Sequence, residues 1–265
     1  MIRAGRFVAV VSIVLFSSLG WAQTGTVATD SELAAITARG RLLYEYDQAA
    51  WHASDAVMAT HPPKEELGRY IARKTDACWE VAFGRLNETR DAFLVAVLAT
   101  EGKSLQEFSV QKLETPQPDS GFYLAAAKGI ESAVRDFQGP KRPYNAAVLP
   151  AAADRLYVYL VPAQTEAGVY PLGADVRYVV SADGAIVEKR QLHKGMIPNG
   201  SAPPGTKMVA GTHSHVLSDV PEDTDVFYVL TRKPSMPEYI GTQSAVYAVN
   251  VDGTVKVVER LKKHR

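Results

Sequence analysis

The chain has 265 residues, of which 46% are apolar and 22% charged, and its net charge at neutral pH is 0. This length and composition predict one large or two small packed globular domains and exclude a low-complexity chain. The charge balance excludes the electrostatic footprint of a protein that binds nucleic acid or anionic lipid. The single cysteine, Cys78, excludes an intrachain disulfide.

The first 22 residues have the three parts of a secretory signal peptide. Arg3 and Arg6 form a positive start, residues 7–16 form an apolar run too short to span a bilayer, and small residues precede Gln23. Residues 1–22 are therefore predicted to be cleaved off, with an uncleaved anchor as the alternative. Cleavage lowers the net charge from 0 to −2. We expect a soluble periplasmic or secreted protein without stable membrane insertion.

The region 23–140 is predicted to consist of helices and hairpins. Its elements are marked by capping residues, by apolar residues that recur every 2 or 3.6 positions, and by Gly or Pro residues that end an element. In chain order these are a helix at 29–60, a short helix at 65–73, a hairpin at 79–99, a strand at 108–113 and a helix at 122–137.

The region 141–265 is predicted to be β-rich, which makes the whole chain α+β. Short Val- and Tyr-rich runs are separated by turn residues such as those of "SADG" and "VDGT". The predicted strands lie at 144–150, 155–162, 176–180, 186–192, 207–213 and 238–242, with a final hairpin at 245–260. An apolar run at 225–232 is interpreted as a short helix, with a strand as the alternative.

Two histidines separated by one residue, in "GTHSHVLSDVPEDTD", carry the main chemical signal of the chain. Because side chains alternate along a strand, His213 and His215 point to the same face. Two imidazoles and one carboxylate are ligands that zinc favours, with a position left for water. The acidic candidates that follow are Asp219, Glu222, Asp223 and Asp225.

This pattern resembles the JAMM (MPN or JAB) metal-protease motif, which reads H-x-H, a spacer and then S-x-x-D. The order of elements over about residues 156–258 is similar as well: a strand, the histidines, a loop, an acid on a short helix and two strands. The resemblance implies that His213, His215 and Asp225 hold zinc. It also implies hydrolysis of an amide or isopeptide bond in a peptide or protein substrate.

In the JAMM family an upstream glutamate activates the metal-bound water. Glu166, in "TEAGVYPLG", and Glu188, on a predicted hairpin strand, are the candidates for this base. The chain departs from the family at Glu222, which stands where the family has serine. A carboxylate there would repel the negative charge that develops on the attacked carbonyl.

Other interpretations of the same residues remain open. The cupin barrel also combines H-x-H with an acid a few residues later, here Asp219, but its glycine pattern is missing. The two histidines can also be polar residues at a strand end, followed by acids that favour the positive end of a helix. In that case the chain is a non-catalytic periplasmic or secreted binding or structural protein.

A second polar group lies on the first predicted helix, in "YEYDQAAWHASD". It contains Asp47, His52 and Asp55. His52 and Asp55 are three residues apart and can pair on one helix face. We interpret the group as a polar face, with a functional site as the alternative.

Overall fold

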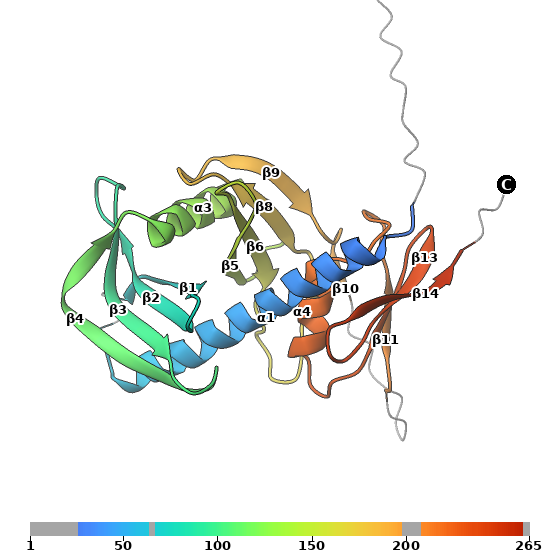
Figure 1. Ribbon diagram of the computed structural model, residues 1–265, viewed down its shortest axis with the longest axis horizontal. Coiled ribbons are helices and arrows are strands. Elements are labelled where there is room, and N and C mark those ends of the chain that lie inside the picture. The colour runs from blue at the N-terminus through green and yellow to red at the C-terminus, as the bar shows by residue number, and fades with distance from the viewer. Residues whose placement is uncertain (1–25, 64–66, 198–207, 262–265) are drawn as a thin grey trace, which may run out of the picture.

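The computed structural model describes residues 26–63, 67–197 and 208–261 (Figure 1). The predicted signal peptide at residues 1–22 lies outside these ranges. Within them the architecture is α+β, as the sequence predicted: helices accompany three four-stranded sheets and a two-stranded ladder. None of the described helices is long and apolar enough to cross a membrane.

The long helix α1 (Asp30–Ala59) runs along the molecule (Figure 1). It begins with the predicted capping box. The Thr29 hydroxyl accepts the backbone N–H of Glu32 at 3.3 Å, and the Glu32 carboxylate accepts the backbone N–H of Thr29 at 2.7 Å. The helix contacts a β-sheet near its C-terminal end and helix α4 (Asp223–Thr231) near its start, so it links the two ends of the fold.

The first sheet consists of β1 (Arg69–Lys74), β2 (Trp79–Leu86), β3 (Phe93–Glu101) and β4 (Phe108–Asp119), antiparallel in that order. It confirms the predicted hairpin and the strand after it. The short helix predicted at 65–73 is wrong over residues 69–73, which belong to β1; residues 65 and 66 lie outside the described ranges, and Leu67 is helical. The φ angle of Gly68 is +58°, which interrupts a helical path, and its backbone bridges to Gly84.

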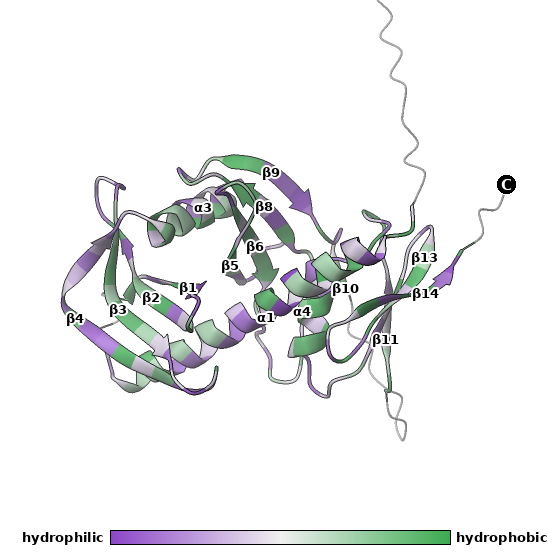
Figure 2. Ribbon diagram, in the orientation of Figure 1, coloured by the Kyte–Doolittle hydropathy of each residue, from purple (hydrophilic) through white to green (hydrophobic). Residues whose placement is uncertain are grey.

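The second sheet has the strand order β5-β6-β8-β9, all antiparallel. Its strands are β5 (Tyr144–Pro150), β6 (Leu156–Pro162), β8 (Val176–Val180) and β9 (Ile186–Gln191), and β7 (Leu172–Gly173) pairs separately with β10 (Met196–Ile197). Helix α3 (Phe122–Asp136) packs between the first and second sheets. Figure 2 shows β6 mainly green and β4 mainly purple, which matches the buried position of β6 and the exposed edge position of β4.

The third sheet contains the segment with the paired histidines. Strand β11 (Gly211–Ser214) pairs in parallel with β12 (Glu238–Gly241), and β13 (Ala245–Val249) and β14 (Val255–Arg260) continue antiparallel. The parallel pairing requires a crossover between β11 and β12, and helix α4 lies in this connection. The short helix predicted after the histidine strand is therefore confirmed.

Three apolar clusters form the core, and each contains residues from both sides of position 140. One of them joins the first turns of α1 to α4 and the third sheet. At Gly40 the two helices approach so closely that an added Cβ would lie 2.4 Å from Val226 Cβ and 2.6 Å from the backbone oxygen of Asp223. This contact fixes the start of α4, where one of the candidate metal ligands is located.

Candidate metal centre

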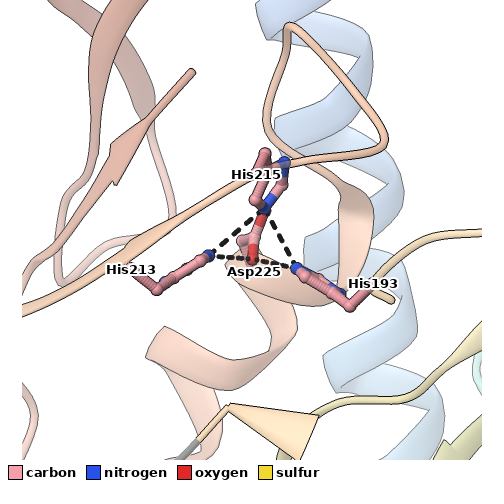
Figure 3. A group of neighbouring side chains, drawn as sticks. All are labelled: His193, His213, His215 and Asp225. Atoms are coloured by element: carbon pink, nitrogen blue, oxygen red, sulfur yellow. Dashed lines mark hydrogen bonds and ion pairs between the residues drawn. The ribbon is translucent and has the colours of Figure 1, made fainter. Parts of the chain in front are cut away.

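Four buried side chains converge where the ends of β9 and β11 meet the start of α4 (Figure 3): His193, His213, His215 and Asp225. One ligand atom of each lies within 4.8 Å of the others. The side chains are 4%, 3%, 1% and 0% exposed, respectively. The structure thus brings together the three predicted metal ligands, and His193 joins them as a fourth candidate that the sequence analysis missed.

The distances between the ligand atoms suit a small metal ion. His215 Nε2 lies 3.0 Å from His193 Nε2 and 3.2 Å from His213 Nε2. Asp225 Oδ1 lies 3.1 Å from His193 Nε2 and 3.2 Å from His213 Nε2, and its Oδ2 lies 3.2 Å from His215 Nε2. Ligands about 2.0–2.1 Å from a tetrahedral zinc are about 3.3–3.4 Å apart, so little movement would be needed.

The other ring nitrogen of each histidine faces a fixed acceptor. The acceptors for His193, His213 and His215 are, in order, Asp175 Oδ1 at 2.8 Å, Glu238 Oε1 at 2.9 Å and the backbone oxygen of Val220 at 3.0 Å. A carbonyl or carboxylate oxygen accepts the Nδ1–H, which leaves Nε2 as the metal-facing nitrogen. Metal-bound histidines are held in the same way by carboxylates and carbonyls.

Strand pairing explains two of these contacts. In the β8–β9 hairpin Val176 lies opposite Gln191, so the residue before β8, Asp175, meets the segment after β9. In the third sheet His213 lies opposite Ile240, and Glu238 is two residues earlier on the same face. His193 and His213 therefore meet their carboxylates through strand register, and the two carboxylates come from segments distant in sequence.

The start of α4 is held by Asp225 and by charged groups outside the metal cluster. Asp225 Oδ2 accepts the backbone N–H of Glu222 at 2.7 Å. The fully buried Asp223 accepts hydrogen bonds from Arg39 Nε at 3.0 Å, Arg177 Nη1 at 2.6 Å and the Tyr159 hydroxyl at 2.7 Å. These contacts tie α4 to α1 and to the second sheet.

The cluster attracts positive charge. Burial alone would lower the pKa of His193, but the carboxylates of Asp175 and Asp225 outweigh it and raise this pKa to about 11. Burial also opposes protonation of His213, whereas its hydrogen bonds with Asp225 and Glu238 raise its pKa to about 9. For Asp225, burial would raise the pKa, but the charges of His215 and His193 hold it well below its usual range.

The two predicted bases lie elsewhere. Glu166 is exposed in the connection between β6 and β7, and Glu188 is exposed on β9. Neither belongs to the cluster formed by the described residues, and a catalytic role for either stays a prediction. Glu222 is buried and its Oε1 lies 2.6 Å from Arg190 Nη2. The Arg190 guanidinium balances the negative charge of Glu222, which the sequence analysis expected to oppose hydrolysis.

A pocket of about 250 Å³ adjoins the cluster. It is lined by residues 192–197 and 214–217, which include His193 and His215. The pocket therefore adjoins two of the four candidate ligands.

No protein-family model, curated protein or solved structure matched the chain. The resemblance to the JAMM family is therefore neither supported nor refuted. The function is inferred below from the cluster itself.

Proposed function

We propose that this chain is an exported zinc-binding protein in which His193, His213, His215 and Asp225 supply all four ligands of a closed site. The observation that carries the proposal is the convergence of three Nε2 atoms and one carboxylate, with each Nδ1 facing an acceptor. Once the metal-facing protons are released, imidazoles held in this way direct three Nε2 lone pairs and the Asp225 carboxylate at one point. Their mutual repulsion favours a cation there.

The type of ligand favours zinc. Imidazole nitrogen and carboxylate oxygen are both common zinc ligands, and four protein ligands are typical of structural sites, whereas catalytic sites keep one position open. Cys78, the only cysteine, is not among the ligands. A bound ion would cross-link the end of β9, the end of β11 and the start of α4, so its first expected effect is on stability.

A second candidate is a zinc-dependent amide or isopeptide hydrolase of the JAMM-like kind. The pocket beside His193 and His215 favours it, because a catalytic site needs space for substrate. In this alternative His213, His215 and Asp225 hold the metal. His193 is not a ligand, so the fourth position is free for water. A zinc ion would then acidify that water, with Glu166 or Glu188 as the base. The closed site is preferred because His193 Nε2 already lies 3.0 Å from His215 Nε2.

Metal analysis of the purified chain separates these candidates. We expect one zinc per chain in the wild type after incubation with zinc and removal of excess metal. His193→Ala should lose it, whereas the control His52→Ala, which changes a histidine of α1 outside the cluster, should keep it.

Two results would redirect the proposal. A His193→Ala variant that keeps a full zinc complement contradicts the closed site and favours the three-ligand hydrolase. In that case peptide and isopeptide substrates should be tested with Asp225→Ala as the inactive control. A wild-type chain that takes up no metal would remove both candidates.

A further inference from the structure

A second pocket, of about 510 Å³, lies between α1, α4 and the segment that joins β6 to β7. Its walls include the polar residues Asp47, Gln48 and Asn145 and the exposed Lys233. Pockets of this size accommodate small organic ligands. None of the four metal ligands lines it, so it is a separate space.

Asp47 is the unusual group in this pocket. In the described part of the chain its carboxylate has no ion pair, and its one recorded hydrogen bond comes from Gln48 Nε2 at 3.4 Å. Removal from water raises the pKa of Asp47 to about 6. Asp47 is half-buried, so its carboxylate is partly removed from water and has no cationic partner among the described residues, and a cationic ligand in the pocket would supply one.

The buried carboxylates elsewhere provide a comparison, since each has a basic partner. These pairs are Asp175 with His193, Glu222 with Arg190, Asp223 with Arg39 and Arg177, Asp225 with the three histidines, and Glu238 with Arg232 and His213. Each acid that is fully buried in the described residues thus has a basic partner, whereas the half-buried Asp47 faces a cavity without one.

Aromatic rings surround this carboxyl group. Tyr44 and Tyr70 line the pocket, and the negative charge of Asp47 contributes, after burial, to the raised pKa of both hydroxyls. Trp51 also lines the pocket and is 56% exposed, which places it at the rim. Phe227 lines the α4 side. Aromatic faces beside a carboxylate attract an organic cation through both charge and the ring quadrupole.

Two threonines of α4 also line the pocket. Thr224 Oγ1 and Thr231 Oγ1 are buried, lack a hydrogen-bond partner within the described structure, and belong to residues that line the pocket. Thr224 is only 2% exposed. Because neither oxygen is exposed to solvent, the two threonines contribute to the wall of the pocket and not to its polar contacts.

We propose that this pocket binds a small organic cation, an amine or guanidinium on an apolar or aromatic body. Its cationic group would pair with the Asp47 carboxylate, and its body would lie against the tyrosine rings and Trp51. The other charges of the lining do not oppose this ligand, because Asp175 is negative and Lys233 is exposed to solvent. The inference goes beyond zinc binding and holds whether or not the metal centre is filled.

The test is calorimetric titration of the full mature chain with 2-phenylethylamine and with its neutral analogue 2-phenylethanol. We expect the amine to bind about tenfold more tightly, because the ring is shared and only the amine can pair with Asp47. Asp47→Asn should remove this preference, and Trp51→Ala should weaken both ligands. The control Asp55→Asn makes the same change at an exposed position on the same helix and should leave the preference intact.

Melting temperatures of the variants establish that they are folded before the comparison is made. The proposal is overturned if amine and alcohol bind equally, or if a folded Asp47→Asn retains the preference for the amine. Absence of amine binding at millimolar concentration also overturns it. A neutral saccharide that binds more tightly than the amine would instead identify the pocket as a polyol site.

Discussion

Replacing Asp175 by asparagine tests the metal centre through a residue that does not reach the ion. Asp175 Oδ1 lies 2.8 Å from His193 Nδ1, and the two side chains are 2% and 4% exposed. Asparagine keeps the shape and can still offer an amide oxygen to Nδ1–H. It removes the negative charge that makes His193 a stronger ligand.

The expected loss is about 10–100-fold in zinc affinity, the usual effect of changing a group that supports a metal ligand, or about 1.4–2.7 kcal/mol. Competition with a chromogenic zinc chelator measures it. Asp55→Asn, an exposed aspartate outside the cluster, serves as the matched control. If Asp175→Asn binds zinc as tightly as the wild type while remaining folded, His193 is not a ligand and the closed site is wrong.

Three further predictions concern protons and packing. Zinc must displace protons, because the raised pKa values of His193 and His213 keep both protonated in the metal-free chain at pH 7. The affinity for zinc should therefore rise with pH. Equal calorimetric heats of zinc binding in buffers of different ionisation enthalpy would contradict this. Arg177→Leu should cost about 1.5–3 kcal/mol in denaturant unfolding, because the fully buried Asp223 loses one charged hydrogen bond but keeps Arg39, whereas Lys189→Leu, which breaks an exposed pair, should cost about 1 kcal/mol or less. Gly40→Ala should lower stability by about 1–3 kcal/mol through its clash with α4, despite the better helix propensity of alanine. Gly102→Ala should be tolerated, because an added Cβ there meets ordinary contacts at 3.4 Å. A thermal shift assay that ranks the two glycine variants the other way would refute the packing argument.

Local signals in the sequence were sufficient for much of the fold. The capping box at Thr29 defines the start of α1, and turn residues mark the β8–β9 and β13–β14 hairpins. The prediction failed at β1, where the segment after Gly68 contains no strong strand pattern. Its extended conformation depends on pairing with β2, and such long-range pairing is not visible in the segment itself.

The metal site shows the same limit. His213 and His215 were found because they were predicted to share one face of a strand, and Asp225 because it follows them closely in the sequence. His193 and Glu238 could be located only by strand register, which a single sequence does not specify. A partial signal for His193 existed, since it directly follows the predicted strand at 186–192, where side chains often reach a site at the sheet edge.

The metal centre and the larger pocket share structural parts, and this connection has a thermodynamic consequence. Asp175 lines the pocket and also holds His193, while Thr224 lines the pocket directly before Asp225 in α4. A pocket ligand that restrains Asp175 or the start of α4 therefore changes how readily the four metal ligands reach one geometry. Coupling of this kind is reciprocal: the factor by which zinc changes amine affinity must equal the factor by which the amine changes zinc affinity. Amine titrations with and without zinc measure this factor, and a factor of one would mean that Asp175 and α4 are already rigid in the metal-free chain.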